Sequence, residues 1–215
     1  MSGKLHVVLI VLLIAASVAA QDLKPISLPS PDTTGGKPLM QVLKSRQSSR
    51  DFSTDSIPLP VLSNLLWAAC GVNRTESGKR TSPSAMNWQE IDLYIVTASG
   101  VFRYDAKTHA LEQILTGDIR ERTGSQPFVK EVPVNLVYVA DYARMSRGSD
   151  EDKMLYSAAD AGFISENVYL FCASEGLATV VRGSVDRSEL AKVMKLRPDQ
   201  KIILAQSIGY PKKSE

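Results

Sequence analysis

The sequence predicts an α+β fold in which helices surround a central, mainly antiparallel sheet. Three observations support this prediction. The 215 residues include 44% apolar side chains, which is enough for a globular core. Helical and strand-like segments mix along the chain without an internal repeat. Two consecutive strands are separated only by the turn Ser99-Gly100, which is typical of an antiparallel hairpin.

Four helices are expected from capping residues and apolar spacing. They span residues 39–47, 58–70, 152–175 and 186–194. Pro58 and Pro60 open the second helix, because proline is favoured in a first helical turn. Gly176 ends the long third helix as a left-handed cap. Asp186, with Glu189 three residues later, forms a capping box for the fourth.

The expected strands cover residues 91–95, 101–104, 132–140, 178–181 and 202–208. Segment 132–140 is mostly apolar, which suits a strand buried on both faces. Residues 73–84 are interpreted as a polar loop. The charged and irregular segment 116–130 is interpreted as a mobile cover.

The first twenty residues have the pattern of a secretory signal peptide. Lys4 precedes the apolar run Val7 to Ala16, and small residues end the segment. We expect cleavage after Ala20, or alternatively after Ala19, and export to the periplasm. The apolar run would span roughly 15 Å of helix against about 30 Å of bilayer hydrocarbon, so an uncleaved anchor is the less favoured alternative. Residues 21–38, rich in proline, are expected to form an extended N-terminal arm.

The composition excludes several classes of function. A net charge of +2 without a long basic run argues against a nucleic-acid partner. Neither a zinc-ligand spacing nor a dinucleotide or phosphate-binding glycine loop is present. Export would leave His109 as the sole histidine, and we interpret it as a solvated turn residue rather than a catalytic base. The remaining possibility is chemistry supplied by a bound cofactor.

The two cysteines allow two interpretations. Cys70 and Cys172 both lie in apolar helical stretches, where cysteine is often a small hydrophobic residue. Export would make a disulfide between them chemically permissible. Two buried thiols are the favoured interpretation, with the disulfide as the alternative.

Two polar clusters suit a phosphate-bearing, partly polar ligand. Segment 46–50 places two arginines around a serine, an arrangement that can hold a phosphate or form a solvated basic turn. Segment 80–89 provides small hydroxyls and the amides of Asn87 and Gln89. These suit a ring edge or a sugar chain, or alternatively cap their own loop.

A third cluster follows the long helix. At Gly183 the backbone of segment 180–183 can approach a ligand closely. Lys212 and Lys213, near the C-terminus, can join a phosphate or simply decorate a solvated tail.

In their order along the chain, these clusters resemble the FMN-dependent nitroreductase family over residues 39–213. The resemblance is carried by Arg46-x-Ser48-x-Arg50-x-Phe52, Ser82-Pro83-Ser84-Ala85-x-Asn87-x-Gln89, Ala159-x-Ala161-Gly162, Ala173-x-Glu175-Gly176-Leu177, Gly183 and Ile208-Gly209-Tyr210-Pro211. The helix end Trp67-Ala68-Ala69-Cys70-Gly71 and the loop Arg80-Thr81-x-Pro83-Ser84 are similar to the branch containing peptide thiazole/oxazole dehydrogenases.

The resemblance implies a nitroreductase-like domain over residues 39–215 and an intertwined homodimer with two FMN sites at its interface. It implies that flavin N5 carries the hydride, so no side chain need act as acid or base. The implied FMN-binding residues are Arg46, Ser48 and Arg50 for the phosphate and ribityl chain, Ser84 and Asn87 for the ribityl chain or ring edge, the backbone of Val180, Val181, Arg182 and Gly183 near N5, and Lys212 and Lys213 for the phosphate. The partner is expected to cover the long helix around Phe163, Val168 and Leu170.

Two positions depart from the family pattern. Common members carry an acidic residue where this chain has Arg182, whose positive side chain could alter the flavin potential. The peptide branch has glycine after Pro-Ser-Ala, whereas this chain has Met86, so the peptide substrate class is not carried over.

The function expected from these features is an exported FMN oxidoreductase. It would pass hydride or electrons to or from a small organic substrate that is nitroaromatic-, quinone- or enone-like. Its electron donor is unknown, because NAD(P)H is not expected outside the cytoplasm. Two alternatives are a flavin dehydrogenase or oxidase of a peptide or other organic substrate, and a non-catalytic FMN-binding protein.

Overall fold

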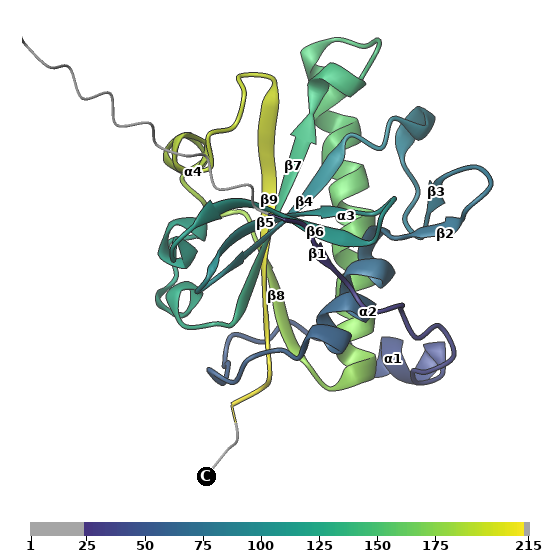
Figure 1. Cartoon of the computed structure of the whole chain (residues 1–215), viewed down its shortest axis with the longest axis vertical. Coiled ribbons are helices and arrows are strands. Elements are labelled where there is room, and N and C mark those ends of the chain that lie inside the picture. Colours follow the sequence, from purple (N-terminus) through teal and green to yellow (C-terminus); the bar gives the residue numbers. More distant parts are fainter. Residues whose placement is uncertain (1–23, 213–215) are drawn as a thin grey trace, which may run out of the picture.

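A seven-stranded antiparallel sheet forms the centre of the computed structural model, which describes residues 24–212 (Figure 1). The predicted signal peptide lies outside the described residues. Each pair of neighbouring strands is antiparallel, as predicted. In spatial order the strands are β1 (Ile26–Ser27), β6 (Ala110–Thr116), β5 (Gly100–Asp105), β4 (Ile91–Thr97), β7 (Val134–Asp141), β9 (Gln200–Gly209) and β8 (Ala178–Arg182).

Helices cover both faces of this sheet. Three of them, α1 (Leu39–Ser45), α2 (Leu59–Cys70) and α3 (Asp150–Glu175), lie on one side, and α4 (Arg187–Val193) lies on the other (Figure 1). The predicted helical shell is therefore confirmed. Helix α1 ends at Ser45, two residues earlier than predicted, and the chain continues as irregular backbone through residues 46–50.

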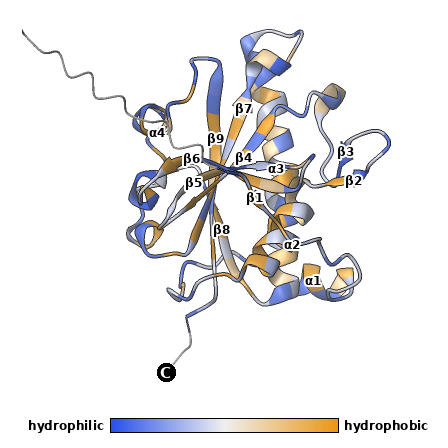
Figure 2. Cartoon of the chain, in the orientation of Figure 1, coloured by the Kyte–Doolittle hydropathy of each residue, from blue (hydrophilic) through white to orange (hydrophobic). Residues whose placement is uncertain are grey.

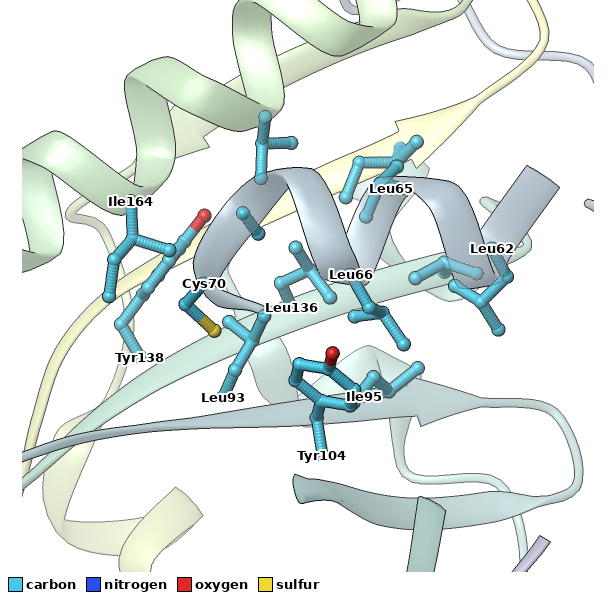
Figure 3. Packing of buried hydrophobic residues seen from close by; sticks show 14 of the residues in the cluster. Leu62, Leu65, Leu66, Cys70, Leu93, Ile95, Tyr104, Leu136, Tyr138 and Ile164 are labelled. Atoms are coloured by element: carbon cyan, nitrogen blue, oxygen red, sulfur yellow. The ribbon is translucent and has the colours of Figure 1, made fainter. Parts of the chain in front are cut away.

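The two faces of the sheet carry separate hydrophobic cores, because side chains alternate along each strand. On β4, Leu93 and Ile95 pack toward α2 and α3 (Figure 3). Their neighbours Tyr94 and Val96 join the cluster under α4. Strand β7 is buried along its whole length, as its apolar sequence predicted. Apolar residues accordingly line the sides of the helices that face the sheet (Figure 2).

The caps of α3 explain its length. Ser149 accepts the Asp152 N–H, and the Asp152 carboxylate accepts the Ser149 N–H at 3.0 Å, which together form a capping box. This box starts the helix two residues earlier than predicted. Gly176 ends it with φ 74°, the predicted left-handed cap.

The capping box predicted for α4 is only half formed. Asp186 accepts the Glu189 N–H at 3.0 Å, as predicted. The Glu189 carboxylate instead contacts Lys192 Nζ at 2.6 Å, one helical turn further on. A nearby lysine therefore competes with the helix N-terminus for this carboxylate.

Two stretches contain strands that the sequence analysis did not predict. Within and beside the expected loop 73–84, β2 (Val72–Arg74) and β3 (Lys79–Arg80) form a separate two-stranded hairpin. Strand β6 pairs with β5 and also with the short strand β1 of the N-terminal segment. Residues 26 and 27 of the expected arm thus form the edge of the sheet.

Segment 116–130 is fixed to the sheet rather than being a mobile cover. Arg182 is 4% exposed, and its guanidinium donates to Thr123 O at 2.6 Å, Asn135 Oδ1 at 2.9 Å and Ser207 Oγ at 3.2 Å. Its partners among the described residues are neutral oxygen atoms, and burial lowers its pKa to about 10. At pH 7 this buried arginine therefore remains charged and ties the segment to β7, β8 and β9.

His109 is not the solvated turn residue that we expected. Its ring is half-buried, with Nδ1 2.8 Å from Tyr104 Oη and Nε2 2.7 Å from Ser63 Oγ. Nε2 also lies 3.0 Å from the carbonyl oxygen of Pro29. Desolvation lowers the pKa of His109, so the neutral ring is favoured. The prediction failed because the N-terminal segment folds back over this turn.

Cys70 and Cys172 are present as two buried free thiols, the favoured interpretation. Burial raises the pKa of the Cys70 thiol to about 11 and also raises that of Cys172. Both thiols therefore stay protonated at neutral pH.

A substitution at Gly124 tests the attachment of segment 116–130. Gly124 has extended backbone, but an added Cβ would lie 1.9 Å from Arg182 Nη1. We expect Gly124→Ala to lower the unfolding free energy by about 1–3 kcal/mol in urea titrations, because the buried guanidinium must move. In the Arg182→Met background the same change should cost much less. Equal costs in both backgrounds would contradict this account.

Candidate functional site

Three segments that are distant in sequence meet at the end of β8. The Ser49 N–H donates to Thr179 O of β8 at 2.9 Å, and the Lys212 N–H donates to Asp51 O at 3.2 Å. A bridge between Phe52 and Pro211 continues this pairing. The chain that leaves α1 is therefore held between β8 and the C-terminal segment, as the predicted phosphate site requires.

Tyr169 of α3 lies at the centre of this junction, and the sequence analysis missed it. Its hydroxyl is 2.8 Å from Ser48 Oγ and accepts the backbone N–H of Val181 at 2.9 Å. The Arg46 guanidinium lies over its ring, 5.3 Å from the centroid. A tyrosine in an apolar helix is typical of a core residue, so the sequence contained no signal for this contact. We call Arg46, Ser48, Tyr169 and Val181 the Arg46 cluster.

The Arg46 cluster provides groups suited to a phosphate. Arg46 is half-buried, and Ser48, Arg50, Gly183 and Lys212 are exposed. Within residues 24–212, neither Arg46 nor Arg50 forms a salt bridge with a carboxylate. Two arginines without acidic partners, together with a serine hydroxyl, fit the phosphate of a nucleotide-like cofactor. Lys213 lies outside the described residues.

Successive side chains of β8 point to opposite faces of the sheet. The backbone of Val181 faces the Arg46 cluster, whereas Val180 and Arg182 direct their side chains to the other face. The Arg182 side chain is thus committed to Thr123 and Asn135, so only its backbone remains available to a ligand.

The second candidate region is the loop of residues 82–89, which contains the 3-10 turn Ala85–Asn87. Ser84 Oγ accepts the Gln89 N–H at 2.8 Å, and Asp160 Oδ2 of α3 accepts the Ala85 N–H at 2.9 Å. Asn87 is exposed, with φ 56° in the left-handed region that asparagine tolerates. The loop therefore caps part of itself, as the structural alternative proposed, while its tip remains accessible.

A buried pair of carboxyl groups supports this loop. Glu90 is 0% exposed and Asp160 is 3% exposed, and the two groups face each other beneath Ser84. Glu90 Oε2 accepts from Ser84 Oγ at 3.3 Å, while Oε1 has no hydrogen-bond partner in the described part of the chain. Burial, followed by the charge of Asp160, raises the pKa of Glu90 to about 7. One carboxyl is then protonated below this pH and can donate to the other.

The Arg46 cluster and loop 82–89 lie at different places along α3. The loop contacts Asp160, whereas the cluster contains Tyr169, nine residues further along the helix. That separation corresponds to about 13 Å along the helix axis. In Figure 1 the hairpin that leads into the loop and the end of β8 likewise lie apart. The loop and the Arg46 cluster therefore contact α3 more than two helical turns apart.

Two classes of structure are absent from residues 24–212. No helix there has both the length and the apolar character needed to cross a bilayer. No group of three or more His, Cys, Asp and Glu side chains there is arranged to hold a metal ion.

The fold and the order of these segments are those of one protein family. The model of the nitroreductase family matches residues 43–210. The chain belongs to the nitroreductase family. It is similar to a "putative nitroreductase" of Methanocaldococcus jannaschii, with 29% identity over 169 residues that cover 74% of this chain and 85% of that protein. The crystal structure of a "putative nitroreductase" from Ralstonia eutropha JMP134 is 45% identical, covers 88% of this chain and 90% of its own, and has a TM-score of 0.85.

Two more distant structures share the fold. The Escherichia coli microcin synthetase McbBCD complex, with truncated pro-MccB17 bound, matches with 16% identity and a TM-score of 0.69, covering 96% of this chain and 85% of that one. The NADPH:FMN oxidoreductase of Vibrio harveyi, complexed with NAD+, matches with 18% identity and a TM-score of 0.61, covering 81% of this chain and 69% of that one. The predicted α+β nitroreductase-like fold is thereby confirmed.

The carboxyl pair predicts an unusual pH dependence of stability. Because folding raises the pKa of Glu90 from its ordinary 4.5 to about 7, the fold binds a proton more tightly than the unfolded chain. The stabilisation that the Glu90 proton gives to the fold is fully present below pH 4.5 and is lost as the pH rises through 7. We expect this group to lower the unfolding free energy by up to about 3 kcal/mol between pH 4.5 and pH 8.

Glu90→Gln tests this expectation, because the amide can donate to Asp160 at every pH. The variant should lose less stability than the wild type between pH 5 and pH 8 in urea titrations. Glu76→Gln, at an exposed hairpin position, makes the same change in charge and should leave the wild-type pH profile unaltered. If stability depended on pH in the same way in Glu90→Gln and the wild type, the proposed proton between Glu90 and Asp160 would be ruled out.

Proposed function

We propose that this protein is an FMN-dependent oxidoreductase that transfers hydride or electrons to or from a small organic substrate. The observation that carries the proposal is the Arg46 cluster together with Arg50, which places a serine and two arginines without a carboxylate partner in the described residues beside β8. The family membership and the name of the Vibrio harveyi structure support FMN as the cofactor.

Each part of the site would have a binding or positioning role. Arg46, Ser48 and Arg50 would hold the phosphate and ribityl chain, with Lys212 and Lys213 beside them. The backbone at Val181 and Gly183 would approach the ring, since an added Cβ at Gly183 would meet no atom within 4 Å. The bound flavin supplies the hydride-transfer chemistry at N5. Tyr169 would orient Ser48 and keep the Val181 N–H fixed.

We further propose an intertwined homodimer in which loop 82–89 of one subunit completes the flavin site of the other. Two observations support it. Loop 82–89 and the Arg46 cluster are separated by about 13 Å along α3. Helix α3 also exposes large apolar side chains, with Leu155 66% exposed and Phe163 48% exposed. Val168, which we expected at the interface, is instead buried in the core of the subunit.

Export to the periplasm remains part of the proposal, supported by the signal-peptide pattern of residues 1–20. A donor other than NAD(P)H would then reduce the flavin. The substrate class is proposed as nitroaromatic-, quinone- or enone-like.

The visible absorption spectrum of the purified protein tests cofactor binding directly. We expect a flavin spectrum and the release of FMN on heating. Arg46→Ala should weaken FMN binding by about tenfold to a hundredfold, because charge-assisted hydrogen bonds to phosphate are lost. Lys44→Ala, at an exposed position on α1, should retain the wild-type affinity. A colourless protein that fails to take up added FMN would refute the proposed function.

Light scattering tests the homodimer. At micromolar concentration the wild type should have the mass of two chains. Phe163→Glu places a charge on the exposed face of α3 and should shift the protein toward a monomer with less bound FMN. Lys107→Glu, in the exposed turn between β5 and β6, should remain dimeric. A monomeric wild type that retains FMN would contradict the shared site.

A further inference from the structure

The hairpin of β2 and β3 concentrates positive charge without balancing it. In its register Arg74 is directly opposite Lys79, and Arg80 follows on the same strand. Like charges at directly opposed positions destabilise a strand pair. None of the three side chains forms a salt bridge within the described part of the chain. Packing of the hairpin itself does not account for this arrangement.

These cations line one cavity of about 360 Å³. Its other lining residues include Ser82, Ser84, Asn87 and Gln89, and it has no acidic lining residue. Arg74 is held in place by donating to Arg80 O at 2.5 Å and to Asn73 Oδ1 at 3.0 Å. A cavity that three cations line, without an acidic lining residue, is suited to an anionic group.

Arg80 adds an independent observation. The Arg80 Nε atom is buried and has no hydrogen-bond partner among residues 24–212. A buried donor without a partner is costly, so a ligand oxygen that accepted from it would recover stabilisation. Arg80 lines the cavity together with Lys79 and Arg74, so an anion bound there would lie among all three cations.

We propose that this cavity binds a carboxylate group of the organic substrate and thereby selects anionic substrates. The inference rests on the proposed function, because Ser84 and Asn87 belong to the predicted flavin-binding set. A phosphate has related chemistry, but the Arg46 cluster, which does not line this cavity, already provides groups for the FMN phosphate. The hairpin would thus hold one end of the substrate while the reacting group lies at the flavin.

Two ligands of similar shape, one anionic and one neutral, distinguish the effect of ligand charge from the effect of ligand shape. Calorimetric titration of the oxidised, FMN-loaded protein would compare 4-nitrobenzoate with the neutral 4-nitrobenzamide. We expect the benzoate to bind at least tenfold more tightly at low salt, with the difference shrinking as salt is added. Because binding is measured without turnover, a protein that binds the benzoate but reduces neither probe would retain this inference while losing the proposed activity.

Lys79→Glu is the critical variant. It should weaken 4-nitrobenzoate binding by at least tenfold and leave 4-nitrobenzamide binding unchanged. Thermal stability should be equal or higher, because the new carboxylate faces Arg74 across the hairpin. Lys107→Glu makes the same charge change outside the cavity and should affect neither ligand.

Three results would overturn the inference. The first is equal affinity of the wild type for the two probes. The second is loss of FMN from Lys79→Glu, which would assign the cations to the cofactor. The third is tighter binding of inorganic phosphate than of 4-nitrobenzoate, which would make the cavity a site for free phosphate.

Discussion

The structure depends on the packing of α3 against the sheet. One side of this helix is buried, and the other side is exposed. Val168 and Ile164 pack into the core beneath the sheet, while Leu155 and Phe163 on the same helix remain exposed. A 26-residue helix spans about 39 Å, so it passes both loop 82–89 and the Arg46 cluster. Asp160 and Tyr169 extend from it to these two regions and fix their separation. The same helix thus supports each half of the proposed site and keeps the halves apart within one chain.

Polar groups buried in the sheet reinforce its register. Asn135 Oδ1 on β7 accepts from Ser207 Oγ of β9 at 2.6 Å and from the Arg182 guanidinium of β8 at 2.9 Å. On the opposite face, Tyr138 donates to Gln206, whose amide donates to Thr179 Oγ1 at 3.0 Å. A slip of one residue would break every one of these contacts. The end of β8, where the proposed ligand would bind, is therefore held rigidly by residues outside the site.

Local signals made most elements predictable from the sequence. The prolines before α2, Gly176 after α3 and the apolar run of β7 each have one dominant structural meaning. The hairpin of β2 and β3 was missed because its residues are polar and its strands are very short. His109 was misinterpreted because its environment is created by Pro29, eighty residues earlier.

The candidate site was predictable where backbone order and residue type sufficed. Arg46, Ser48 and Val181 meet because the chain after α1 pairs with β8, as the ordered motifs implied. Tyr169 and the Glu90–Asp160 pair could not be predicted, because a tyrosine, an aspartate and a glutamate at those positions carry no motif. Their roles arise from tertiary proximity, and only the coordinates show which polar atoms are buried together.

The two buried cysteines provide a native probe of how the core opens. Cys70 ends α2 and packs between this helix and the sheet (Figure 3). Cys172 lies near the end of α3 and is buried in the same core. A thiol reagent can reach them only when these helices transiently separate from the sheet. The rate of alkylation would therefore report the free energy of local opening, without any engineered label. The alkylation rate, measured with and without a bound ligand, would show whether a ligand at β8 raises the free energy needed to separate α2 and α3 from the sheet.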